Sequence, residues 1–251
     1  MTGKEAWLDY SRRLYDAGLS IIFEADKMAV GSSTKDPKVL ALALLCRTLS
    51  NFNGAVLMIE AAMPVEARTL TRCCFENLLW LAELTEKGDA FVEEMVRDEV
   101  SSQQARGKMV LSWSDRLEDQ APYAEGLRAS LEQMKEKHPK AKAIRFGDLG
   151  KENRIADSYL WFRQLSSDAA HPSLTSLSRY MFKQPNNVVT LSIAPDMKEK
   201  EAEDTLQYAT QALMGVCVAT CTICKVPNSH AALSPLFEEF ITLAQQGGTF
   251  K

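Results

Sequence analysis

Residues 66–83 read EARTLTRCCFENLLWLAE, a pattern typical of a largely apolar α-helix. Arg68, Arg72 and Glu76 recur every four residues, and Glu83 falls close to the same line. At about 100° per residue, these side chains form a narrow charged stripe on an otherwise apolar helix. Charges on a helix that is largely buried are costly unless they are paired. We therefore expect a distant segment of the chain to supply partners for this stripe.

The composition is that of a soluble globular protein with a substantial core. The chain has 251 residues, of which 46% are hydrophobic and 25% are charged. Its net charge of −4 argues against binding nucleic acid through bulk electrostatics, although a local basic face remains open. The first residues, MTGKEAWLDYSRRL, contain no apolar signal region, so we expect a cytoplasmic protein.

Hydrophobic periodicity predicts an all-α protein. Apolar patterns, caps and breakers indicate helices at 4–30, 37–63, 64–87, 89–120, 122–137, 154–170, 197–226 and 234–246, with a further short helix within 173–182. Turn residues at 184–187 followed by VVTLSIAP indicate the one convincing strand, which can pair with residues around 179–182. We predict a single-domain helical bundle of seven to nine helices, with a small β-hairpin near 178–195. The domain spans 1–251, with a core at 37–226, an N-terminal helix in 1–36 and a C-terminal helix in 229–251.

Two features of residues 205–224 need an interpretation. This stretch is uncharged and close to the length that crosses a bilayer. Its glutamines and threonines are scattered around the helix, so we expect a buried core helix and no membrane contact.

Cys217, Cys221 and Cys224 match the cysteine spacing that radical-SAM enzymes use to bind an iron–sulfur cluster. They lie on one helical face without the β/α barrel that such enzymes need, so core thiols are the better interpretation. No histidine is spaced with cysteines as structural zinc requires, and we predict no metal and no cofactor.

A second polar group follows the helix predicted at 154–170. Tyr159, Arg163 and Ser166 recur on one helical face, and His171 follows just beyond its end, where Pro172 stops the helix. Imidazole is the side chain whose charge changes most readily near neutral pH. A polar helix terminus whose histidine bonds to backbone carbonyls is the simpler reading. The functional reading is that this face meets the stripe of Arg72 and Glu76, which can pair with each other and still offer a donor and an acceptor.

Both segments carry a resemblance to known proteins. The motifs E-A-R-x-L-x-R-x-x-x-E (66–76) and L-S-x-x-x-x-H-P-S (165–173) resemble a family of uncharacterised helical bacterial proteins over roughly residues 40–225. The pattern is also loosely similar to the HEPN superfamily, whose helical bundles often dimerise and frequently act as metal-independent ribonucleases in toxin and anti-phage systems. The HEPN motif places four to six residues between an arginine and a histidine, whereas seven separate Arg163 from His171 here.

These observations leave two classes of function open. In the first, an RNA-cleaving site lies at a helical cleft or the seam of a homodimer. His171 is then the general acid or base, and Arg163 or Arg72 stabilises the phosphorane. In the second, the protein is a non-catalytic binding or interaction module that holds a small anionic ligand such as a nucleotide, fixes the bundle register, or binds a partner protein. In this second reading the stripe of Arg68, Arg72 and Glu76 holds the ligand. The candidate ligand-binding residues are Glu66, Arg68, Glu76, Tyr159, Ser166 and Ser173.

Overall fold

The computed structural model describes residues 3–29, 32–114, 121–149, 155–185, 187–227 and 229–246. Prolines and capping residues decide where its first long helices begin. After α1 (Gly3–Ala29), Asp36 caps α2 (Pro37–Glu60), because its side chain accepts a hydrogen bond from Lys38 N and Pro37 occupies the first turn. Pro64 starts α3 (Pro64–Lys87), the helix that carries the charged stripe. The predicted cap and the predicted break between α2 and α3 are both confirmed.

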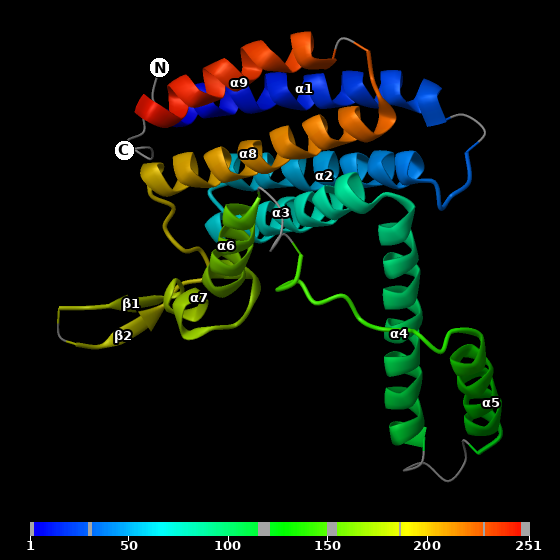
Figure 1. The fold of residues 1–251 in the computed structure, drawn as a ribbon. Coiled ribbons are helices and arrows are strands. Elements are labelled where there is room, and N and C mark those ends of the chain that lie inside the picture. Colours follow the sequence, from blue (N-terminus) through cyan, green and yellow to red (C-terminus); the bar gives the residue numbers. More distant parts are fainter. Residues whose placement is uncertain are drawn as a thin grey trace. The chain divides into compact units, whose positions relative to one another are not determined.

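The remaining described elements are helical except for one small hairpin (Figure 1). They are α4 (Asp89–Ser114), α5 (Ala121–Lys137), α6 (Ala156–Leu165), a π-helix (Ser166–Ala170), α7 (Leu174–Ser178), β1 (Met181–Lys183), β2 (Val189–Leu191), α8 (Glu199–Cys224) and α9 (Ser229–Gln246). The two strands are antiparallel, with Phe182 opposite Thr190. The all-α class with a small β-hairpin is therefore confirmed, with nine α-helices in the described part of the chain.

Several predicted boundaries are corrected. The helix expected at 154–170 is α-helical only to Leu165 and continues as a π-helix, and the short helix expected within 173–182 is limited to Leu174–Ser178. The last helix begins at Ser229 instead of residue 234. The fourth helix is seen to Ser114, and the end predicted for it near residue 120 lies outside the described residues.

The chain divides into two compact units, one of residues 1–86 and 149–251 and the other of residues 87–148. In the smaller unit α4 packs on α5, and the methyl groups of Leu131 lie so close to Gly107 that a Cβ there would be only 2.8 Å from Leu131 Cδ2. The segment after α5 returns to α4, where Ile144 N donates to Asp98 Oδ1 at 2.7 Å. The single helical domain of residues 1–251 that we predicted stays a prediction.

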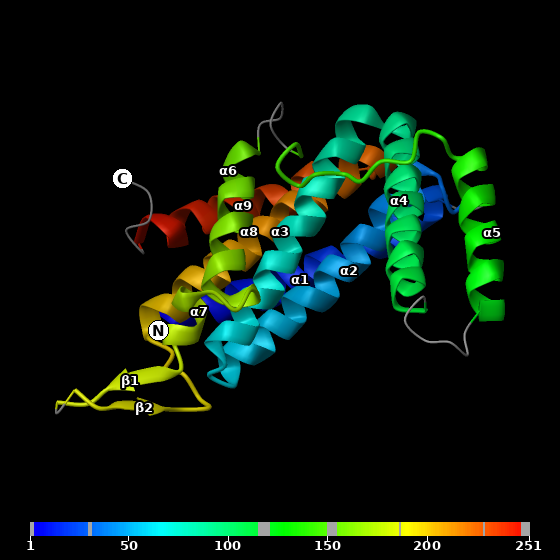
Figure 2. The same ribbon diagram turned by 90° about the horizontal axis from the view of Figure 1, so that it is seen from below.

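The core of the larger unit is built around α8. This helix packs against α1 and α2, which also pack on each other, and α9 lies along α1 and α8 (Figures 1 and 2). Helix α3 joins them through buried side chains, since Asn77 Nδ2 donates to Thr48 Oγ1 of α2 at 3.0 Å. A Cβ at Gly215 of α8 would be only 2.8 Å from Leu78 Cδ1 of α3. The α3 stripe is thus fixed relative to the centre of this unit.

Among the described residues, the helices that are long and apolar enough to cross a membrane, by length and composition only, are α2 and α8. The most apolar window of α2 is 44% buried within the protein, and that of α8 is 61% buried. The core helix of a soluble protein passes the same test. The packing of α8 against both α1 and α2 agrees with the core helix expected for residues 205–224.

Candidate functional site

Arg68 of α3 forms a buried ion pair with a residue one hundred positions later. Its Nη2 lies 2.8 Å from Asp168 Oδ2 in the π-helix, and the side chains of Arg68 and Asp168 are 7% and 21% exposed. Arg68 Nε is also buried and makes no hydrogen bond within the described residues. Because a guanidinium that is out of water needs a counter-charge, this pair ties α3 to the π-helix.

Arg72, one turn further along α3, has three different partners. Its Nε donates to Ser166 Oγ at 3.0 Å, and its Nη1 lies 3.1 Å from Glu76 Oε2. Its Cζ is 4.6 Å from the ring centroid of Phe162, which is close enough for a cation–π interaction. The side chains of Arg72 and Glu76 are each 20% exposed. The two polar segments therefore meet through Arg72 and Ser166, and water reaches the edge of this contact.

The π-helix determines how the chain leaves this contact. His171 N donates to Ser166 O at 2.9 Å, which closes a wider turn than an α-helix allows. Pro172 then keeps His171 extended, at φ −108° and ψ 147°. Ser173 caps α7 by accepting from Ser176 N at 3.1 Å, as expected from its position. Ser166 Oγ also donates to Phe162 O at 2.7 Å. We refer to Arg68, Arg72, Glu76, Ser166 and Asp168 as the α3–π-helix cluster.

The side chains of the other predicted site residues lie around this cluster and, within the described residues, make none of the side-chain hydrogen bonds that hold it together. Arg163 and His171 are exposed. Tyr159 is half-buried, and its ring stacks on that of Phe162 with centroids 6.1 Å apart, on the aromatic residue that Arg72 contacts. Glu66, in the first turn of α3, is half-buried, and it makes none of the contacts that define the cluster within the described residues. The structure thus separates a paired inner part from an exposed outer part.

Comparison with protein families matches residues 38–188 to a family of unknown function, DUF5677. The matched region runs from the first turn of α2 to the hairpin and contains both motifs. The chain belongs to the DUF5677 family. No curated protein and no solved structure matches it.

Two further residues of the matched region, Asp168 and Arg179, contribute to the site and were not predicted from the sequence. Asp168 occupies one of the variable positions of the motif at 165–173, and its backbone carbonyl also accepts from Arg179 Nε at 3.2 Å. Arg179 in turn donates to Glu201 at the start of α8, which lies beyond the matched region. The charge of Arg68 on an apolar helix indicated that some carboxylate of the chain pairs with it. Nothing in the sequence indicated that this carboxylate is Asp168.

Aromatic packing anchors the DUF5677 site to the core helix. Trp161 of α6 stacks on Tyr208 of α8 with ring centroids 4.3 Å apart. Burial raises the pKa of the Tyr208 phenol, and Asp204 and Asp168 raise it further while Arg68 lowers it. Tyr208 is therefore neutral over the physiological pH range, and it lies close enough to Arg68 and Asp168 for their charges to act on its phenol.

The cysteines of the chain differ in exposure. Cys217, Cys221 and Cys224 are buried on α8, as expected for core thiols, and burial raises the pKa of Cys224 to about 11. Cys46, in contrast, is exposed on α2, and Cys73 on α3 is half-buried. Helix α2 is apolar around much of its surface, and the sequence pattern did not distinguish its buried face from its exposed face.

Among the described residues there is no group of three or more His, Cys, Asp or Glu side chains that could hold a metal ion.

Proposed function

We propose that this DUF5677 protein is a metal-independent ribonuclease of the HEPN-like kind, with its reactive groups at the exposed end of α6 and the π-helix. One observation carries the proposal: the exposed His171 directly follows a π-helix that two arginines of α3 hold in place. Irregular helical turns of this kind are frequent at functional sites. Burying the Arg68 guanidinium costs desolvation free energy, which the pair with Asp168 offsets only in part. Such a pair at a surface turn favours the interpretation that the position of the turn is functionally important.

The chemistry assigned to this site is transfer of an RNA phosphodiester to its own 2′-hydroxyl. The 2′-oxygen attacks phosphorus as its proton passes to a base, and the bond to the 5′-oxygen breaks as that oxygen receives a proton from an acid. His171 serves as base or acid, and Arg163 stabilises the negative charge of the phosphorane. A homodimer, which the HEPN resemblance implies, would supply a second His171, so that base and acid come from two copies.

The inner residues take supporting roles in this proposal. Arg72 was a candidate for direct catalysis, but its Nε and Nη1 are already engaged by Ser166 and Glu76. We assign Arg72, Arg68 and Glu76 to positioning the π-helix. Tyr159 and Ser173 lie on either side of this turn and are assigned to substrate placement.

The test uses the full-length protein, end-labelled RNA and a chelator. We expect cleavage in the presence of EDTA, with His171→Ala and Arg163→Ala reducing the rate by about a hundredfold or more. His138→Ala, at a histidine of the smaller unit, is the matched control and should leave the rate unchanged. Circular dichroism must show that each variant is folded. RNA that stays intact, or a cleavage rate that is the same for His171→Ala and the unmodified protein, rules out the proposal.

The toxin or anti-phage role and the dimer are tested separately. If the activity acts in cells, expression of the unmodified chain slows growth and His171→Ala restores it. Sedimentation velocity tests the homodimer directly, and a single species at the mass of one 28.0 kDa chain would contradict it.

The second candidate function is a binding or interaction module. The observation in its favour is that the charged groups of the cluster satisfy one another, as in a contact that fixes bundle register. A small anionic ligand such as a nucleotide would then bind at the partly exposed Arg72–Glu76 edge. Thermal stabilisation by one member of a nucleotide panel, lost in Arg72→Ala, would favour this function, and co-purification would reveal a partner protein.

A further inference from the structure

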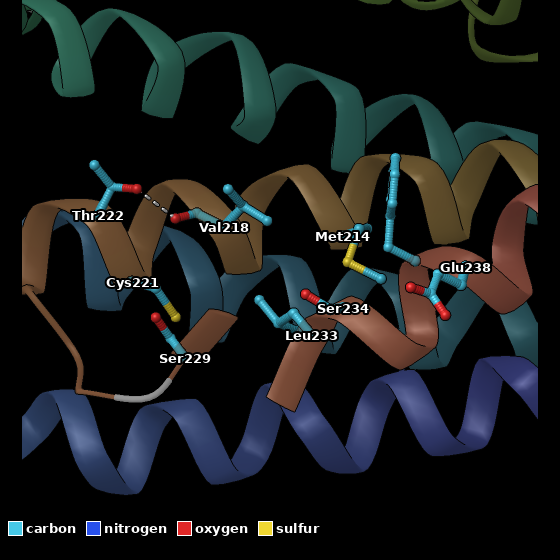
Figure 3. Close-up of a pocket in the computed structure, with 9 residues that line it drawn as sticks. Met214, Val218, Cys221, Thr222, Ser229, Leu233, Ser234 and Glu238 are labelled. Carbon is cyan, nitrogen blue, oxygen red and sulfur yellow. Dashed lines mark hydrogen bonds between the residues drawn. The ribbon is translucent and has the colours of Figure 1, made fainter. Parts of the chain in front are cut away.

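Helices α8 and α9 line an open cavity of about 410 Å³ that the candidate site does not use (Figure 3). The residues that line it are Met214, Val218, Cys221, Thr222, Ser229, Leu233, Ser234, Phe237 and Glu238. A second cavity of about 650 Å³ shares Met214, Val218, Thr222 and Phe237 with the first. The two cavities are therefore continuous along α8, and the second extends toward α3 and the start of α6; we call them together the hollow. These volumes fall in the range of about 300–1,000 Å³ that is usual for small-molecule sites.

The sequence of α9 accounts for an opening at this place. Pro235 lies inside α9, where a proline removes one helical hydrogen bond and its ring crowds the preceding turn. A proline at this position favours a bend in the first turns of α9, beside α8. Val218 on α8 and Phe237 on α9 remain 48% and 51% exposed, although both are large apolar side chains that line the hollow. Apolar surface that water still reaches favours an apolar occupant.

The charge of the lining limits the chemistry of that occupant. Among the described lining residues the carboxylates are Glu238 in the first cavity and Glu86 in the second, and neither cavity has a lysine or arginine. Figure 3 shows the Glu238 side chain at one end of the first cavity, with Cys221 and Ser229 close together at the other. Burial raises the pKa of the Cys221 thiol, so this end of the cavity is neutral.

We propose that this hollow binds a small amphiphile whose apolar chain lies along α8 and whose amino head group reaches Glu238. A fatty acid of the same length would place its carboxylate beside that of Glu238, with no cation among the described lining residues to compensate. The site is separate from the α3–π-helix cluster, and it does not depend on the ribonuclease proposal.

The test compares three probes that differ only in the head group: octylamine, octan-1-ol and octanoate. Isothermal titration calorimetry with the full chain at neutral pH should show octylamine binding more tightly than octan-1-ol by about threefold, the effect of one exposed ion pair. Octanoate should bind more weakly than both. Octanoate binding as tightly as octylamine, or no binding by any probe, overturns the proposal.

Two variants with matched controls locate the site. Val218→Trp fills the hollow and should weaken the binding of all three probes by about tenfold or more, whereas Val189→Trp, at a similarly exposed valine of β2, should not. Glu238→Gln should lower the affinity for octylamine to that for octan-1-ol, whereas Glu136→Gln on α5 should leave it unchanged. Because Glu238 is exposed, its substitution remains informative even if Val218→Trp does not fold. Unchanged octylamine affinity in Glu238→Gln overturns the assignment of the head group.

Discussion

Arg72 Nε donates a hydrogen bond to Ser166 Oγ at 3.0 Å, between residues 94 positions apart in the chain. The same guanidinium lies over the Phe162 ring and pairs with Glu76. One side chain of α3 therefore contacts both the last turns of α6 and the first residue of the π-helix. This relationship makes the surface turn at His171 dependent on a helix that belongs to the core.

Removing Arg68 should destabilise the protein strongly. Arg68→Ala leaves Asp168 without its partner, and we expect a loss of about 3 kcal/mol, near the lower end for buried pairs because Asp168 is partly exposed. Urea unfolding measures this change. Arg12→Ala breaks the exposed pair with Glu60 and serves as the control, with an expected cost below about 1 kcal/mol. Equal costs for the two variants would contradict a structural role for the Arg68–Asp168 pair.

A double-mutant cycle should detect the bond between Arg72 and Ser166. We expect a coupling energy of about 1 kcal/mol between Arg72→Lys and Ser166→Ala, because lysine keeps the charge but lacks the Nε donor and the planar face that lies on Phe162. Additive effects on the free energy of unfolding would show that the hydrogen bond contributes nothing. In the ribonuclease assay, Arg72→Lys should lower the cleavage rate less than Arg163→Ala.

Acid should weaken the contact between α1 and α9. Hydrogen bonding to Arg13 lowers the pKa of Glu239 below its ordinary 4.5, so this pair contributes stability above that pH and loses it as pH falls through the lower, folded-state pKa. Both side chains are more than one-third exposed, so we expect the contribution to be below about 1 kcal/mol. Glu239→Gln should make the loss of stability below pH 4.5 less steep than in the unmodified protein. Glu24→Gln, at an exposed carboxylate of α1, should not, and identical acid profiles for all three proteins would contradict the prediction.

The cysteines should react in the order of their exposure. Burial raises the pKa of Cys74 and Cys217, and both are fully enclosed, so their reactive thiolate forms are scarce and inaccessible. Cys46 is exposed, and we expect iodoacetamide to label it first in the native protein at mildly alkaline pH. Mass spectrometry after proteolysis identifies the labelled sites, and labelling in urea supplies the control in which all six react. Simultaneous native labelling of Cys46 and Cys217 would contradict the packing of α8.

Local sequence signals predicted the main elements because their causes are local. Asp36 and Pro37 specify the start of α2 whatever lies around them, and Pro64 opens α3. Turn residues and β-branched residues specified the hairpin. The π-helix was missed because the 154–170 pattern fits an α-helix, and the additional residue in the turn depends on contacts with α3.

The sequence by itself determined that α3 carries charges in need of partners, because helical spacing alone puts Arg68, Arg72 and Glu76 on one line. It also placed His171 beyond a helix end, because Pro172 disfavours the α-helical conformation of the residue that precedes it. Only the tertiary structure decided that Asp168 forms the ion pair with Arg68 and that Arg72 donates a hydrogen bond to Ser166. It also decided that Arg163 and His171 are exposed. Pairing across 100 residues depends on how α3, α6 and α8 pack, and periodicity within one segment carries no information about that packing.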